Sequence, residues 1–251
     1  MFWFIPLIAF FASILTFFSG FGLGTILLAS LIWYYPPEQA IAITALVHLL
    51  NSLIKSLLNR AVDWGIILRF GISSLLFALV GSTIMFYLSR TTVHLFDLTR
   101  SSLTHPVTVL SFTIGLIMLI VSLFEIGMKG KSWNIPLWLG GALSGFMGGL
   151  SGHQGALRSA FLVKELDDAK RFVSTSAFIG LITDVARNTV YIMDIPWSDV
   201  DLKLLFLTAG AAIAGVLVGT KLLTKVKIRA IQWIVSIGMA LLGTSMMLGV
   251  I

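Results

Sequence analysis

The sequence contains no cysteine, only 6 prolines among 251 residues, and few charged side chains. The absence of cysteine excludes disulfides, cysteine-ligated metals and thiol chemistry. Charged residues make up 11% of the chain and hydrophobic residues 57%, whereas soluble domains are about a quarter charged. This composition excludes an ordinary soluble domain and predicts a polytopic membrane protein.

Metal and cofactor chemistry has little support in the sequence. The 4 histidines are scattered without metal-ligand spacing, so we expect neither zinc nor haem. The glycines at 20–24 follow no strand and do not form a dinucleotide fingerprint. Serines such as Ser19 and Ser151 lack a histidine–carboxylate relay. We therefore expect no cofactor, no bound metal and no enzymatic activity.

The chain is basic, with a formal net charge of +6 and a pI near 9.8. Its basic residues lie mainly in short loops between apolar segments. Loop charges of this kind orient proteins in membranes. We therefore expect the lipid bilayer, and not a nucleic acid, as the surrounding partner.

Two glycine-rich breaks interrupt the hydrophobic pattern. The first, Ser-Gly-Phe-Gly-Leu-Gly at 19–24, lies inside an apolar stretch from 2 to 33, and the second, Gly-Gly-Leu-Ser-Gly-His-Gln-Gly, lies at 148–155. Glycine loosens a helix. Unwound backbone in hydrocarbon is tolerated only where protein or a water-filled cavity surrounds it. Breaks at matching places in two halves are typical of a transporter's midplane site.

Three apolar spans follow each break. They are predicted at 40–58, 65–88 and 107–124 in the first half, and at 169–193, 202–223 and 228–251 in the second. The longest polar connection is 89–106. We predict an all-α polytopic membrane protein with two inverted repeats, 1–124 and 137–251, joined by a loop at 125–136. The repeats form one integrated membrane domain.

Length and charge both favour re-entrant broken segments. A straight helix of about thirty residues would reach about 45 Å, against a hydrocarbon core of about 30 Å. If both segments re-enter, Arg90, Arg100 and Lys203 lie on the side of the N-terminus. A larger group lies on the other side: Arg60, Arg69, Lys129, Lys131, Lys164, Lys170, Arg171, Lys221, Lys225, Lys227 and Arg229. Both termini are then outside. Strongly tilted straight helices are the alternative.

Polar residues form a stripe on each of two matching spans. Helical spacing places these residues on one face of 40–58: Thr44, His48, Asn51, Ser52, Lys55 and Asn59. The span 169–193 carries Ser176, Gly180, Asp184, Arg187 and Tyr191. Ionisable residues inside a membrane are costly and indicate function by default. Two structural alternatives stay open: Lys55 reaches the interface, and Asp184 and Arg187 form a purely structural ion pair.

The second break carries His153, Gln154 and Arg158. A helix starting near Gly155 would direct free N–H groups and the positive end of its dipole at the break, which favours an anion. Arg158 would add a full charge and several donors. The helix after Gly24 offers the same dipole without the side chain. The alternative is that the glycines serve close helix packing.

Two residues are candidates for proton coupling, His48 and Asp184. His48 lies on the polar face of its span, and histidine titrates near neutral pH. A hydrogen-bonded structural histidine is the alternative. His94 and His105 lie in the long connection, where we expect them in solvent.

The two breaks resemble those of the TauE/SafE family of sulfite and organosulfonate exporters. The first copy is followed by an apolar helix, a proline turn and Ala-Ile-Ala-Ile-Thr at 40–44. The second, Gly-Gly-Leu-Ser-Gly-His-Gln-Gly-Ala-Leu-Arg-Ser-Ala-Phe-Leu at 148–162, is the more specific match. The family's breaks commonly read Gly-x-Gly-Gly-Gly with a proline a few residues later. Here Ala29 and Ala160 stand near the proline positions, and Leu23, His153 and Gln154 interrupt the glycines.

The resemblance implies a small permease with two related halves that carries sulfur-containing anions. With the breaks and stripes, it predicts a bacterial inner-membrane carrier in which one half rocks against the other around a midplane site. The predicted substrate-binding residues are Gly20, Gly22, Gly24, Asn51, Lys55, Gly152, His153, Gln154, Gly155, Arg158 and Arg187. Two rival hypotheses are an anion channel and a membrane assembly factor that transports nothing. The sequence leaves open whether the chain forms a homodimer.

Overall fold

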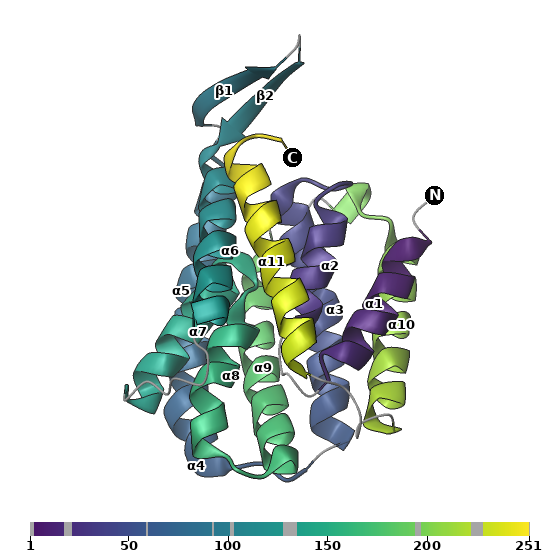
Figure 1. Ribbon diagram of the computed structural model, residues 1–251, viewed down its shortest axis with the longest axis vertical. Coiled ribbons are helices and arrows are strands. Elements are labelled where there is room, and N and C mark those ends of the chain that lie inside the picture. Colours follow the sequence, from purple (N-terminus) through teal and green to yellow (C-terminus); the bar gives the residue numbers. More distant parts are fainter. Residues whose placement is uncertain are drawn as a thin grey trace.

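The fold is almost entirely helical (Figure 1). The computed structural model describes residues 3–17, 22–58, 60–91, 93–100, 103–127, 135–193, 197–221 and 228–250. The first half contains α1 (Phe4–Leu15), α2 (Leu23–Leu31), α3 (Pro37–Leu58), α4 (Trp64–Ile66), the π-helix η1 (Ile67–Gly71), α5 (Ile72–Ser89) and α6 (Val109–Gly127). The second contains α7 (Leu137–Ser151), α8 (Gln154–Glu165), α9 (Ala169–Tyr191), the 3-10 helix η2 (Trp197–Asp199), α10 (Leu202–Lys221) and α11 (Ile228–Met247).

Three described helical segments are long and apolar enough to cross a membrane. They are Pro37–Leu58, Trp64–Ser89 and Leu202–Lys221, and they agree with the predicted spans to within a few residues. Shorter apolar helices occupy Phe4–Leu15, Val109–Phe124 and Ser236–Met247. Helix α9 has 23 residues but buries Asp184 and Arg187. Its polar face requires other helices around it and not lipid.

Each broken segment consists of two short helices that contact each other. Helices α1 and α2 have 12 and 9 residues, and α7 and α8 have 15 and 12. At about 1.5 Å per residue, none of the four reaches the roughly 30 Å of a hydrocarbon core. In Figure 1 the N-terminus, the C-terminus and the connection from α2 to α3 lie toward one end of the molecule, and α4 lies at the other.

The second break is shorter than the predicted range 148–155. Helix α7 continues through Gly148 and Gly149 to Ser151, and α8 begins at Gln154, so only Gly152 and His153 interrupt the helices. The first break agrees better, since α2 begins at Leu23. Residues 18–21, which include the predicted site residue Gly20, lie outside the described part of the chain.

Close helix packing explains Gly149, one of the glycines that extended the predicted second break. A Cβ on Gly141, Gly145 or Gly149 would lie 2.1 to 2.2 Å from a backbone oxygen of the α4–α5 segment. These positions repeat every four residues and form one stripe on α7. The alternative weighed for glycine, that small residues let two backbones touch, therefore holds for Gly149. The contact is equally close from the other side. A Cβ added to Gly81 of α5 would lie 2.3 Å from the Phe146 backbone oxygen of α7.

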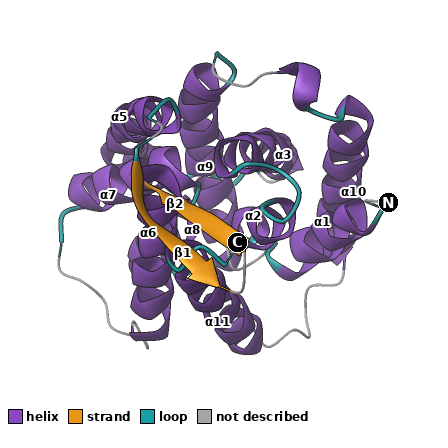
Figure 2. Ribbon diagram, turned by 90° about the horizontal axis from the view of Figure 1, so that it is seen from above, coloured by secondary structure: helices purple, strands orange, loops and turns teal. Residues whose placement is uncertain are grey.

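Helices of one half pair mainly with helices of the other. Helix α5 packs on α7, α1 on α10, α3 on α9, and α6 on α11. Figure 2 shows α3 and α9 near the centre of the bundle, with α1 and α10 on one side and α5 and α7 on the other. The polar stripes of α3 and α9 are thereby placed in the interior.

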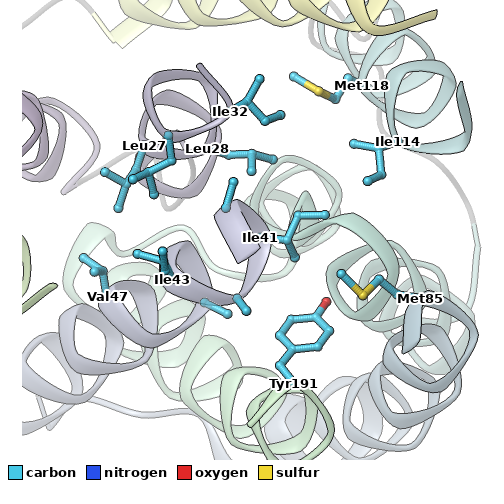
Figure 3. Packing of buried hydrophobic residues seen from close by; sticks show 14 of the residues in the cluster. Leu27, Leu28, Ile32, Ile41, Ile43, Val47, Met85, Ile114, Met118 and Tyr191 are labelled. Atoms are coloured by element: carbon cyan, nitrogen blue, oxygen red, sulfur yellow. The ribbon is translucent and has the colours of Figure 1, made fainter. Parts of the chain in front are cut away.

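The largest apolar cluster fills the space between these central helices and α2, α5 and α6. Leu28 of α2, Ile41 of α3 and Met118 of α6 belong to it, and all three are almost fully buried. Figure 3 shows these side chains within the cluster, with Ile41 nearest to Met85 and Tyr191. The cluster includes Leu150 and Ala156, which flank the second break, so it packs against the helix ends there.

The connection predicted at 89–106 is not irregular but forms a β-hairpin outside the helical bundle (Figure 1). Strand β1 (His94–Arg100) pairs antiparallel with β2 (Leu103–Thr108), with Leu98 opposite His105. Threonine, valine and phenylalanine in this stretch favour strands. Pro106 is tolerated because each strand of a two-stranded sheet has a free edge. The prediction of an all-α fold thus misses this element.

The glycine stripe on α7 predicts a strong difference between two Gly→Ala substitutions. We expect Gly145→Ala to lower the free energy of unfolding by about 1–3 kcal/mol, because its Cβ overlaps the backbone of α5. Gly210→Ala on α10 is the matched control, since a Cβ there meets open space and alanine favours the helix. Thermal unfolding in detergent, followed by tryptophan fluorescence, checks both. Equal melting temperatures for wild type and Gly145→Ala would contradict the packing.

Candidate functional site

The N-termini of α2 and α8 meet at one small buried cavity. Its lining comes from both breaks, from α3 and from α6: Gly22, Gly24, Thr25, His48, Val121, Gly152, His153, Gly155 and Ala156. The space open to a water molecule is about 10 Å³, enough for roughly one water. The two glycine-rich breaks, far apart in sequence, therefore form a single site.

Two backbone conformations at the breaks require glycine. Gly22 has φ 110° and directly precedes α2, and Gly152 has φ 84° and directly follows α7. A side chain is strained in this left-handed region, whereas glycine enters it without a steric penalty. The Gly152 N–H still donates to the Gly148 oxygen, at 3.0 Å, and closes the last turn of α7. These two residues let the chain reverse beside the cavity.

The first turns of α2 and α8 present an electropositive end to the cavity. Gly22 and His153 are the N-cap residues, and neither supplies a side-chain acceptor to the helix that follows. The first N–H groups of a helix have no partner within it. Together with the helix dipole, they form a surface that favours a negative charge.

Asp184 is the centre of the polar network beside this cavity. Its side chain is completely buried. Oδ2 accepts from His48 Nδ1 at 2.6 Å and from the Ser52 hydroxyl at 3.0 Å, and both donors lie on α3. Oδ1 accepts from Gln154 Nε2 at 2.7 Å and from Arg187 at 2.7 and 3.0 Å. One carboxylate therefore connects α3, α8 and α9.

Arg187 joins the network to the second break. Its guanidinium donates through two nitrogens to Asp184, and Nη1 donates to the Gly148 oxygen at 3.3 Å. A Cβ on Gly152 would lie 3.1 Å from the same Nη1. The predicted pairing of Asp184 with Arg187 is thus confirmed, and the arginine lies against the turn that carries the cavity.

Two more cations lie deep in the bundle. Arg158 is 2% exposed and donates from Nε to the Ser176 hydroxyl at 3.0 Å. A Cβ on Gly180 would lie 2.9 Å from Arg158 Nη1, so glycine there makes room for the guanidinium. Lys55 is also buried and lies over the Phe17 ring, with Nζ 5.5 Å from the ring centre. The Lys55 side chain is therefore covered by protein; the sequence had left open that it reaches the membrane interface.

Buried polar atoms without a hydrogen-bond partner cluster near the cavity. Within the described part of the chain these include His153 Nε2, Gln154 Oε1 and Thr44 Oγ1. His153 Nδ1 is held by the Ser151 hydroxyl at 3.0 Å, which fixes the ring. Buried polar groups are nearly always satisfied in proteins, by protein atoms or by bound water. Unsatisfied atoms here fit a site that a small polar ligand or water completes.

The predicted site residues fall into three groups. Gly22, Gly24, His48, Gly152, His153 and Gly155 line the cavity. Gln154, Asp184 and Arg187 form the network joined to His48. Arg158 on α8 and Lys55 on α3 are buried but do not line the cavity. Asn51 points elsewhere, because its Nδ2 donates to the Ser13 hydroxyl on α1 at 3.0 Å. The Asn51 side chain therefore does not line the cavity.

Several participating residues were not singled out from the sequence as site residues. Ser144 donates to the Gln154 backbone oxygen at 2.9 Å and holds the start of α8. The Tyr191 hydroxyl donates to the Gly149 oxygen, and Asn188 Nδ2 donates to the Ala45 oxygen at 3.2 Å. Val121 of α6 closes one side of the cavity. Tyr191 belonged to the predicted polar stripe, whereas single residues such as Ser144 and Val121 carry no sequence signal without the tertiary contacts.

The sequence matches the family model described as Sulfite exporter TauE/SafE over residues 5–246. The chain belongs to the TauE/SafE family. The match includes both breaks and all the helices that form the cavity. Comparison with curated proteins and with solved structures gives no match.

TauE/SafE membership assigns the chain to membrane transporters of sulfur-containing anions and not to enzymes. The apolar helices of this TauE/SafE protein fit a multi-pass membrane protein. The helix N-termini at the cavity and the Arg187 guanidinium beside Gly152 also fit an anionic cargo.

The Asp184 network predicts a large stability loss for one isosteric substitution. We expect Asp184→Asn to lower the free energy of unfolding by about 3–5 kcal/mol, because it leaves Arg187 buried without its counter-charge. Adding Arg187→Gln should recover part of that loss, since no uncompensated charge then remains at the pair. Thermal unfolding in detergent measures both. Asp199→Asn, whose carboxylate accepts from an exposed neighbouring serine, is the control, and a loss no larger than in this control would contradict the network.

Proposed function

We propose that this TauE/SafE protein carries a small sulfur oxyanion or organosulfonate through the cavity between its two breaks. One observation supports the proposal above all others. Two helix N-termini, each beside a left-handed glycine, converge on a buried cavity next to basic side chains. Peptide N–H groups and guanidinium groups are the usual ligands of oxyanions in proteins.

The donors around the cavity suit an oxyanion with several oxygens. N–H groups at the starts of α2 and α8 would bind the oxygens, with Arg158, Arg187 and Lys55 supplying positive charge. His153 Nε2 would donate one further bond. The unsatisfied Gln154 Oε1 would accept from water or from the hydroxyl of a protonated oxyanion. The His48–Asp184 pair is the candidate for proton coupling.

The size of the cavity supports a cycle with closed and open states. Room for one water is several times too small for an oxyanion of sulfur. Substrate entry therefore requires the helices around the breaks to separate, first on one side of the membrane and then on the other. Saturable counterflow in vesicles distinguishes this carrier cycle from a channel.

The helix pairing supports two inverted repeats with re-entrant broken segments. In the two halves, α1 corresponds to α7, α3 to α9, α5 to α10 and α6 to α11. The observed pairs of α1 with α10, α5 with α7, α3 with α9 and α6 with α11 are unchanged by this exchange. A pseudo-two-fold axis in the membrane plane would produce this arrangement.

Re-entrant segments and loop charge together give an orientation. The end with Arg60, Arg69 and Arg171 would face the cytoplasm of a bacterial inner membrane, and the β-hairpin and both termini would face outward. An anion leaving a negative-inside cell gains about 2.3 kcal/mol per charge per 100 mV. Export then needs no coupling ion.

Arg158 is the side chain whose removal tests anion binding most directly. We expect Arg158→Ala to weaken binding of sulfite, sulfoacetate or a related anion by about 10- to 100-fold, because it removes a charge-assisted donor from a buried site. Isothermal titration and flux into proteoliposomes measure the effect. Arg69→Ala, at an exposed position, is the matched control. A panel of sulfur oxyanions and sulfonates with neither binding nor flux sensitive to Arg158→Ala would refute the proposal.

Single-cysteine labelling tests the orientation, because the natural chain has no cysteine. We expect Thr91→Cys, at the hairpin end, to react with an impermeant maleimide added outside intact cells. We expect Asp167→Cys, in the turn between α8 and α9, to react only after the membrane is opened. Both positions are exposed. The reverse pattern would show that the termini face the cytoplasm.

A further inference from the structure

A wide groove lies at the end of the bundle that carries α4 (Figure 1). It has a volume of about 750 Å³ and is lined by five residues between Leu68 and Leu76, by 135–138, and by Lys164 and Glu165. These residues belong to η1 and α5, to the start of α7 and to the end of α8, and we call the site the α5–α7 groove. None of them lines the cavity between the breaks, so the two sites are separate.

Part of the groove is apolar and open to the surroundings of the protein. Leu68, Ile72 and Leu76 follow one another at four-residue intervals, and they are 60%, 51% and 54% exposed. They belong to the segment Trp64–Ser89, which is apolar enough to cross a membrane. Trp138, at the start of α7, is 56% exposed, and tryptophan near the end of a membrane segment is typical of the headgroup level. These side chains therefore contact lipid and not water.

Two cations also line the groove. Arg69 belongs to η1 and Lys164 to the last turn of α8, and both side chains are exposed. Arg69 takes part in none of the salt bridges that the described residues form with one another. Glu165 supplies the one carboxylate of the described lining, so two positive charges and one negative charge give the groove a net charge of +1. The groove therefore favours an anion.

Charged and apolar side chains follow each other in order of depth. Arg69 lies five residues after Trp64, where the spanning segment begins, and Leu76 lies seven residues further in. At about 1.5 Å per residue, Arg69 is thus roughly 8 Å and Leu76 roughly 18 Å from the start of the segment. Arginine near the end of a span keeps its guanidinium at headgroup level while its stem stays in the apolar region. A phosphate beside Arg69 would therefore have its acyl chains alongside Ile72 and Leu76.

We propose that the α5–α7 groove binds a phospholipid with a singly charged anionic headgroup. Its phosphate lies between Arg69 and Lys164, and an acyl chain follows Ile72 and Leu76 along α5. Guanidinium and ammonium groups are good donors to phosphate, and basic pockets between spanning helices at the cytoplasmic face bind anionic headgroups. Phosphatidylglycerol would neutralise the net charge of the groove, whereas zwitterionic phosphatidylethanolamine would not. The inference does not depend on the cargo of the cavity.

Native mass spectrometry of the delipidated protein in detergent tests this site. The protein is titrated with phosphatidylglycerol and with phosphatidylethanolamine of the same acyl chains, and inorganic phosphate at the same concentration is the competitor in a parallel series. Arg69→Gln and Lys164→Gln each remove one cation, singly and together. The double variant Lys170→Gln/Lys221→Gln is the matched control, because it removes two exposed cations that do not line the groove.

We expect each single variant to bind phosphatidylglycerol about 5-fold more weakly than the parent and the double variant about 30-fold more weakly, because each basic side chain near a membrane surface favours an anionic lipid by about the smaller factor. The control should match the parent. Binding of phosphatidylethanolamine should be weaker and should change little in any variant. Inorganic phosphate should not displace the lipid, since it gains nothing from the apolar part of the groove.

Tryptophan fluorescence locates the bound lipid. Phosphatidylglycerol with brominated chains quenches nearby tryptophans, and we expect a saturable component of the quenching in the parent. Trp138→Phe should remove part of that component, because Trp138 lines the groove. Trp3→Phe is the control, since this exposed residue lies at the start of α1 and outside the groove.

The lipid site is refuted if the Arg69→Gln/Lys164→Gln variant binds phosphatidylglycerol as its control does, or if the two lipids bind equally well. Displacement of the lipid by inorganic phosphate would also refute it, in favour of a site for a free anion. Sulfite binding in detergent is measured on the same variants and should equal that of the parent, because the groove and the cavity share no lining residue. A parent that binds the lipid selectively but no sulfur anion would support the groove and refute the proposed cargo alone.

Discussion

The buried carboxylate of Asp184 constrains the centre of this protein more than any other single group. A fully buried charge is strongly unfavourable unless donors surround it. Here the donors come from α3, α8 and α9, so those helices have to be close to one another and in one register. The position of α8 in turn fixes its N-terminus, and the cavity between the breaks follows from that. The polar network and the proposed anion site are therefore parts of one arrangement.

Glycine serves two separate purposes within a few residues of the second break. Gly152 allows the chain to enter a left-handed conformation, whereas Gly149 allows two helices to touch. The first purpose creates an irregular backbone beside the cavity. The second holds α7 rigidly against α5. A site formed by helix ends needs both, because N–H groups can bind a charge only if the helices that carry them are fixed.

Local patterns predicted the parts of this structure that depend on neighbouring residues. Helical spacing gave the polar stripe of α3 and the pairing of Asp184 with Arg187, and hydropathy gave the spans within a few residues. Contacts between distant segments were beyond such patterns. The hydrogen bond from Gln154 to Asp184 depends on how α8 packs against α9.

The extent of the second break was misjudged because glycine favours both unwinding and packing. Gly141, Gly145 and Gly149 already had the four-residue spacing of a helix contact. The contact of Asn51 with Ser13 was beyond reach for the same reason, since nothing local shows that α1 lies opposite Asn51.

The glycine contacts bear on which parts of the molecule can move. Where backbone atoms of two helices are in direct contact, sliding or separation would expose polar groups and lose dense packing. Helix α5 of the first half is joined in this way to α7 of the second, and Gly215 of α10 lies similarly against Phe10 of α1. Under the proposed transport cycle, each of these helix pairs is expected to move as one unit. The boundary between the moving parts would then cross the two halves of the chain and would not separate them.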